Sequence, residues 1–113
     1  MDVTLRCRCG EFEALLASPA AARRAVCYCR DCRAYLHFLE RGNELLDGNG
    51  GSDVLAVQPH NVKITRGADR LACMSLSERG LYRWYASCCR TPFANTPRNP
   101  RMSYAGVSTT CVA

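Results

Sequence analysis

Lysine is nearly absent from this sequence of 113 residues, which has a single lysine against fourteen arginines. Aromatic residues make up 8% of the chain and tryptophan occurs once, so the residues present can build only a modest hydrophobic core. Histidine occurs twice, which leaves few nitrogen ligands for a metal site. No apolar run approaches the ~18 residues that a membrane-spanning helix needs, so we expect no membrane partner.

The first residues also lack a secretory signal. Met1 to Cys7 shows no basic segment followed by an apolar one, and no cleavage site. We therefore expect a cytoplasmic protein, in which thiols stay reduced unless a metal binds them. The length fits one domain spanning residues 1–113.

Cysteine, by contrast, is abundant: the chain has nine, an odd number that disulfides cannot pair completely. Cys27, Cys29 and Cys32, here called the three-cysteine cluster, lie at spacings of two and three. Residues i and i+2 of an extended segment share a face, and a turn after Arg30 would bring Cys32 back to them. Three converging thiolates suit Zn²⁺ and leave one tetrahedral position open, as in catalytic zinc sites.

Three other interpretations apply to this cluster. A disulfide requires a geometry that cysteines two apart on a strand rarely reach. An iron–sulfur cluster is also held by thiolates. Buried apolar cysteines are common, but three within six residues, flanked by charges, do not resemble a core segment. The spacing and the softness of sulfur favour zinc over these alternatives.

A second set of cysteines lies far apart in the sequence. Cys7 and Cys9 form a Cys-x-Cys pair before Gly10, and Cys88 and Cys89 follow an aromatic segment. Together these residues, here called the four-cysteine cluster, would form a closed structural zinc site that connects the two ends of the chain and contributes to folding. Of the remaining cysteines, we expect Cys73 in the core and Cys111 in a tail.

Apolar alternation and turn residues predict a mainly β fold with antiparallel sheets and one short helix. The helix is expected over residues 32–40, directly after the three-cysteine cluster, and Gly42 is expected to end it. His37 falls inside this helix, where a surface position is favoured over a ligand role. Residues 62–66 and 70–76 are expected to pair as a hairpin. The other expected strands cover residues 3–9 and 11–16 as a hairpin, 24–29, 53–58 and 81–86.

The formal net charge of +5 suggests nucleic acid as a partner, but the cysteines weaken that suggestion. Seven thiolates and two Zn²⁺ would reduce the net charge to +2. Several arginines flank cysteines, where positive charge lowers a thiol pKa. These arginines are Arg6, Arg8, Arg30, Arg33 and Arg90. We therefore do not expect a nucleic-acid partner.

The order of these motifs resembles the family of glutathione-dependent formaldehyde-activating enzymes and centromere protein V. The motifs are Cys-x-Cys-Gly at residues 7–10, Cys-x-Cys-x-x-Cys-Arg at 27–33, and an aromatic strand ending in a Cys-containing Thr-Pro turn at 83–92. Residues 50–53 and 83–96 resemble an uncharacterised branch of that family. The resemblance implies a β-tent fold whose sheets meet at a structural zinc, with a second, exchangeable zinc in the three-cysteine cluster.

By the same resemblance, Cys7, Cys9 and Cys89 match ligands of the structural zinc, and Cys27, Cys29 and Cys32 match the catalytic cluster. Ala86 stands where the family has its fourth structural cysteine, and we expect Cys88 to replace that ligand. Arg90 stands where the family usually has glycine.

The resemblance implies a carbon–sulfur lyase that acts on glutathione or another small thiol together with an aldehyde. The alternative is a non-catalytic, zinc-stabilised module that binds a protein or a nucleic acid. The sequence shows no evident general base, and this favours the alternative.

Overall fold

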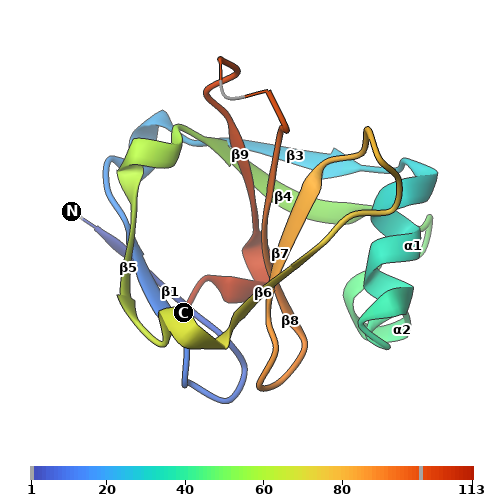
Figure 1. Cartoon of the computed structure of the whole chain (residues 1–113), viewed down its shortest axis with the longest axis horizontal. Coiled ribbons are helices and arrows are strands. Elements are labelled where there is room, and N and C mark those ends of the chain that lie inside the picture. The colour runs from blue at the N-terminus through green and yellow to red at the C-terminus, as the bar shows by residue number, and fades with distance from the viewer. Residues whose placement is uncertain (1, 100) are drawn as a thin grey trace.

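Two antiparallel β-sheets dominate the computed structural model, which describes residues 2–99 and 101–113 (Figure 1). The smaller sheet has the strand order β1-β2-β5, with β1 at Val3–Arg6, β2 at Glu13–Leu16 and β5 at Val62–Arg66. The larger sheet has the order β3-β4-β9-β8-β7-β6. Its strands are β3 (Arg23–Cys27), β4 (Ser52–Val57), β6 (Leu71–Met74), β7 (Tyr82–Ala86), β8 (Thr91–Thr96) and β9 (Ala105–Ser108). The predicted mainly β fold with antiparallel sheets is confirmed.

Helix α1 (Arg30–Phe38) directly follows the three-cysteine cluster, as the helical spacing predicts. A second, unexpected helix, α2, covers Gly42–Leu45. Gly42 therefore begins a helix, and the prediction that it ends α1 is wrong; the chain instead leaves α1 through Glu40, which has a positive φ of 60°. The described residues also contain four short 3₁₀ turns: η1 (Pro19–Ala21), η2 (Pro59–Asn61), η3 (Ala68–Arg70) and η4 (Thr109–Cys111).

No helix in residues 2–99 and 101–113 has the length and the apolar character needed to cross a membrane.

The two faces of the larger sheet carry different cores. One face packs against the smaller sheet, where the rings of Phe12 and Phe93 meet edge to face at 4.8 Å. The other face packs against α1 and the residue that follows it, where three residues are buried with Tyr85 packed against them. These three are Tyr35, Leu36 and Leu39. Figure 1 accordingly shows the smaller sheet and the helices on opposite sides of the larger sheet.

Strand β7 serves both cores because its side chains alternate between the faces. Trp84 and Ala86 pack into the core between the sheets. Tyr85 packs on the α1 side, and the Arg83 guanidinium lies over the Tyr35 ring at 5.5 Å. This alternation places a buried arginine next to the first turn of α1.

The predicted hairpin of residues 62–66 and 70–76 is wrong. Strand β5 pairs antiparallel with β2, and β6 pairs antiparallel with β7. Gly67, at a positive φ of 75°, and η3 carry the chain from the smaller sheet to the larger one. A glycine turn between two strand-like segments is typical of a hairpin, but the same turn also allows a crossover between sheets, and here β5 completes the smaller sheet beside β2.

Replacing Gly67 with alanine should destabilise the protein by at least about 2 kcal/mol, because a Cβ there would overlap the carbonyl oxygen of Glu11 in a left-handed backbone conformation. Gly48 is the matched control, since a Cβ on it would have no neighbour within 4 Å and its φ is not positive. Thermal unfolding of the two alanine variants measures the difference. Equal midpoints of thermal unfolding for the two variants would contradict the close approach of the backbone at Gly67.

Two cysteines differ in their burial from what the sequence predicts. Cys73 is exposed on β6, an edge strand of the larger sheet, so the prediction that it belongs to the core is wrong. Cys111, expected in a tail, is 1% exposed in η4. The chain end folds back there, as Leu5 bridges to Val112 and the backbone N–H of Ala113 donates to the carbonyl of Thr4 at 3.0 Å.

These positions predict very different reactivity toward alkylating reagents. Burial raises the pKa of the Cys111 thiol to about 12, which suppresses the reactive thiolate at neutral pH. Labelling of the native protein with iodoacetamide, followed by mass spectrometry of peptides, should modify Cys73 at least ~100-fold faster than Cys111. In denaturant the two rates should converge. Fast labelling of native Cys111 would show that the chain end does not hold this position.

Candidate metal centres

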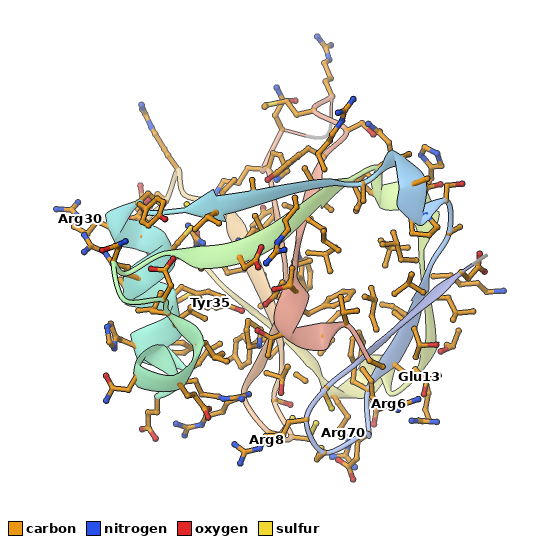
Figure 2. The ribbon with its side chains drawn as sticks, turned by 180° about the vertical axis from the view of Figure 1, so that it is seen from behind. Arg6, Arg8, Glu13, Arg30, Tyr35 and Arg70 are labelled. Carbon is orange, nitrogen blue, oxygen red and sulfur yellow. The ribbon has the colours of Figure 1, made fainter. Side chains whose placement is uncertain are left out.

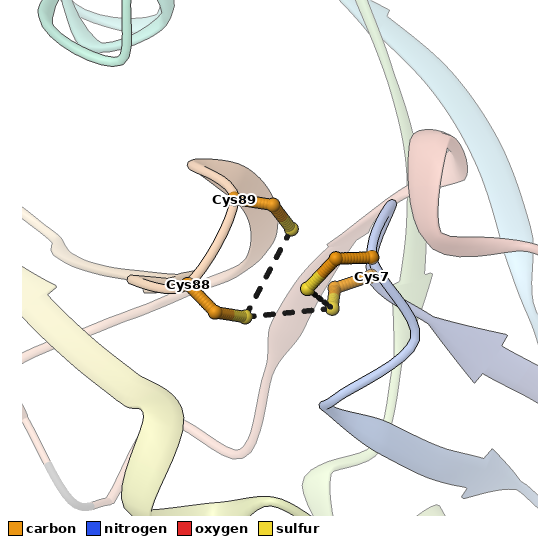
Figure 3. Close-up of side chains that lie close together, drawn as sticks. Cys7, Cys88 and Cys89 are labelled. Carbon is orange, nitrogen blue, oxygen red and sulfur yellow. Dashed lines mark hydrogen bonds between the residues drawn. The ribbon is translucent and has the colours of Figure 1, made fainter.

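The four-cysteine cluster forms where two turns meet. Cys7 and Cys9 lie in the turn after β1, which is closed by a hydrogen bond from Gly10 N–H to the Cys7 carbonyl at 3.0 Å. Cys88 and Cys89 lie in the turn between β7 and β8. Figure 3 shows the sulfur atoms from the two turns pointing toward one another. All four Sγ atoms lie within 4.8 Å of one another.

The spacing of these sulfurs fits a tetrahedral metal ion. The Sγ–Sγ distances are 3.7 Å from Cys7 to Cys9, 3.7 Å from Cys7 to Cys88, and 4.0 Å from Cys88 to Cys89. Four sulfurs about 2.3 Å from a central Zn²⁺ would stand about 3.8 Å apart. The cluster therefore could hold a metal ion with little rearrangement.

Cys88 reaches the cluster from a turn. It was expected to replace the ligand missing at Ala86, and it lies in the turn after β7. Ala86 is 1% exposed and faces the core between the sheets. The turn brings both adjacent cysteines to the cluster, and Arg90, at a positive φ of 56°, adopts the conformation that glycine favours.

Thr91 supports a thiolate at Cys89, a role that sequence reasoning missed. Its buried hydroxyl oxygen accepts hydrogen bonds from the Arg8 backbone N–H at 3.1 Å and from Arg41 Nη1 at 3.2 Å. Two acceptor positions are then used, so the hydroxyl hydrogen is free to donate to Cys89 Sγ at 3.0 Å. Burial opposes ionisation of Cys89, but hydrogen bonds from Thr91 and the backbone of Cys9 lower its pKa to about 6.

The three-cysteine cluster forms where β3 passes into α1. Cys27 ends β3, Cys29 is the N-cap of α1, and Cys32 lies in the first helical turn. The Cys27 Sγ lies 3.2 Å from that of Cys29 and 3.0 Å from that of Cys32. A zinc ion would spread these sulfurs by less than about 1 Å. No fourth histidine, cysteine or carboxylate of the described residues joins the group.

Helix geometry orients this cluster. The Cys29 sulfur accepts a hydrogen bond from the Cys32 backbone N–H at 3.4 Å, so it takes the position of a capping side chain. The partial positive charge of the helix N-terminus therefore faces the sulfurs. Burial acts to raise the pKa of Cys29, but hydrogen bonds from the Cys32 backbone and from Cys27 lower it overall.

Arg83 is the second residue that sequence reasoning missed. It is 3% exposed, and its Nη1 donates to the Cys32 sulfur at 3.5 Å. Burial raises the pKa of Cys32 to about 12, with contributions from the Cys27 and Cys29 thiols, and Arg83 acts in the opposite direction. A buried cation beside three sulfurs favours a net negative charge on the cluster, which three thiolates around a divalent ion would supply.

The seven predicted site residues thus come together in two separate clusters, each able to hold a metal ion. The two histidines do not join them: His37 and His60 are exposed and belong to neither group. Arg30 and Arg33, expected beside Cys32, lie in the first turns of α1. Figure 2 shows Arg30 at the end of the helix nearest the cluster.

A protein-family model described as a family of unknown function, DUF6151, matches residues 1–113. No curated protein matches the chain significantly. Among solved structures, a Rhodobacter sphaeroides protein is similar, with a TM-score of 0.64 and 23% sequence identity over 96% of this chain and 86% of the other. At that identity the likeness shows the fold.

Proposed function

This chain belongs to the DUF6151 family, whose function is unknown, and we propose that it is a zinc protein that binds a small thiol at the three-cysteine cluster and adds it to an aldehyde. The observation that carries this proposal is the difference between the two clusters. Four sulfurs converge at one and three at the other, where no further ligand side chain of the described chain is present. A closed set suits a structural ion, and an incomplete set leaves room for a substrate atom.

Zinc is the metal best suited to both sets. Ligand sets made of thiolates alone favour Zn²⁺ among the common divalent ions, and the four-cysteine spacing matches a tetrahedron with Zn–S distances of about 2.3 Å. The resemblance of the cysteine order to glutathione-dependent formaldehyde-activating enzymes supports the same assignment. Glutathione is accordingly the first thiol to test.

The chain's own residues would prepare the sulfur for reaction. When bound at the three-cysteine cluster, Zn²⁺ would hold a substrate thiol as its thiolate at neutral pH. Arg83 compensates the negative charge that three cysteine thiolates bring. In the addition, a sulfur–carbon bond forms, the π bond of the aldehyde carbonyl breaks, and the carbonyl oxygen takes up the proton that the thiol lost. Cys32, at the base of the cluster, is buried, and Cys29 is exposed, so substrate would approach from the Cys29 side.

The test is the rate of adduct formation from formaldehyde and glutathione, followed by NMR with ¹³C-labelled formaldehyde. Zinc-loaded protein should exceed the protein-free rate, and Cys27→Ser should return it to background. The matched control is Cys73→Ser, which changes an exposed cysteine outside both clusters. A rate equal to background with glutathione and with other small thiols would remove the lyase proposal and favour the non-catalytic binding module.

A further inference from the structure

Arg83 has a hydrogen-bonding group that nothing in the described chain satisfies. Its Nη1 contacts Cys32, but its Nε is buried without a partner among residues 2–99 and 101–113. The side chain also takes part in no ion pair with a described carboxylate. A buried donor of a charged group is destabilising when it has no partner, so such a group is most simply explained by a ligand.

The surroundings of Arg83 are open on one side. It lines a groove of about 580 Å³ that runs from the three-cysteine cluster to the loop between β6 and β7. Cys29 lies at one end of this groove and Arg79, in the loop, is also part of its wall. The groove is lined by Cys29, Arg30, Asp31, Arg79, Gly80, Leu81 and Arg83. The lining of the groove thus contains three arginines and a single acidic residue.

Ion pairs divide the arginines of the described residues into two groups. Seven pair with a carboxylate, as Arg66 does with Glu13 at 2.9 Å and Arg90 with Glu40 at 2.8 Å. Of the seven that do not, three line this groove. Neither Arg30 nor Arg79 has an ion-pair partner within the part of the chain that the structure describes. Unpaired positive charge therefore collects next to the cluster that has an open position.

We propose that this groove is an anion subsite, and that the thiol bound at the three-cysteine cluster carries a carboxylate that Arg83 and Arg79 recognise. The inference deepens the proposed function and rests on it. Thiols with a carboxylate close to the sulfur should bind better than neutral thiols of the same shape. Guanidinium groups suit this task because their planar array of N–H donors matches a carboxylate.

Distances support a short separation between the two groups of the ligand. A sulfur sharing a zinc ion with Cys32 would lie about 3.8 Å from the Cys32 sulfur, by the tetrahedral geometry used above. Arg83 Nη1 lies 3.5 Å from that same sulfur. A carboxylate one or two carbons from the ligand sulfur can therefore reach the guanidinium. Mercaptoacetate satisfies this requirement, and mercaptoacetamide is its neutral counterpart.

The experiment compares these two thiols on protein loaded with Co²⁺, whose visible absorption changes when a further thiolate binds. Mercaptoacetate should bind at least ~10-fold more tightly than mercaptoacetamide. Arg83→Met should abolish the preference, and Arg79→Gln should reduce it at least ~3-fold while leaving the Co²⁺ content unchanged. Arg23→Gln removes the same charge four residues before Cys27 on β3 and should leave the preference intact.

The possible results separate the two proposals. Equal binding of both thiols to the parent protein would overturn the anion subsite and leave thiol binding in place. A spectrum that neither thiol changes would overturn thiol binding at this cluster and the subsite with it. If Arg83→Met does not fold, Arg79→Gln decides, because Arg79 lies in an exposed loop. An unchanged preference for mercaptoacetate in Arg79→Gln would show that residues elsewhere distinguish the two thiols. That result would overturn the proposal that the groove is an anion subsite.

Discussion

Replacing Cys7 with serine should remove most of the stability of this protein, lowering the free energy of unfolding by at least about 4 kcal/mol because the binding energy of a structural zinc contributes to folding. Cys7 is 3% exposed, and its sulfur lies 3.7 Å from those of Cys9 and Cys88. Its sulfur also accepts a hydrogen bond from Phe12 N–H at 3.4 Å. The substitution therefore affects the turn after β1 as well as the metal.

A large loss is expected because of what the cluster connects. The turn after β1 belongs to the smaller sheet, and the turn between β7 and β8 belongs to the larger one. The apolar core between the sheets is modest, so a metal that joined two such distant segments would supply a large share of the free energy of unfolding. Thermal denaturation of zinc-loaded protein, with Cys73→Ser as the control, measures the effect. A Cys7→Ser variant as heat-stable as Cys73→Ser would contradict a structural site at this cluster.

Mild chelation should remove about one equivalent of zinc while the fold survives, because the three-cysteine cluster supplies three protein ligands and the four-cysteine cluster supplies four. Stronger chelation should then remove the second equivalent together with the β-sheet signal in circular dichroism.

Variants assign each step of this titration. Cys27→Ser should abolish the first loss of zinc, which leaves the circular dichroism unchanged. It should not affect the second loss of zinc, which accompanies unfolding. Loss of all metal and all structure in one step from the parent protein would show that the two sites do not differ in the way proposed. If Cys27→Ser kept the first, weakly held equivalent of zinc, that ion would have to lie outside the three-cysteine cluster.

Local patterns were sufficient to predict several elements of this fold. Alternation and Gly10 predicted the hairpin of β1 and β2, and helical spacing after Cys29 predicted α1. Pairing between distant strands was not accessible in the same way. Strand β5 joins β2 rather than β6, because which sheet a strand completes depends on burial across the whole molecule rather than on the intervening turn.

The candidate sites show the same contrast between features that local sequence predicts and features that depend on tertiary packing. Cysteine spacing predicted the three-cysteine cluster, whose members converge through one turn, whereas the four-cysteine cluster was predicted by combining two short motifs that lie far apart in the sequence. Arg83 and Thr91 were missed because an arginine in a strand and a threonine before proline normally face solvent. Their burial results from the packing of α1 against β7 and from the meeting of the two cysteine turns. Cys73 and Cys111 were misplaced for a related reason: the edge position of β6 and the return of the chain end to β1 are tertiary features.

The most direct test of the two-site account is X-ray diffraction at the zinc absorption edge, from crystals grown without chelator, combined with a metal count on the same sample. The account predicts two zinc ions per chain at full loading and two anomalous peaks. One should lie about 2.3 Å from the four sulfurs of Cys7, Cys9, Cys88 and Cys89, and the other at the same distance from Cys27, Cys29 and Cys32. Absence of an anomalous peak at either cluster in fully loaded protein, or a peak whose energy identifies iron, would contradict it.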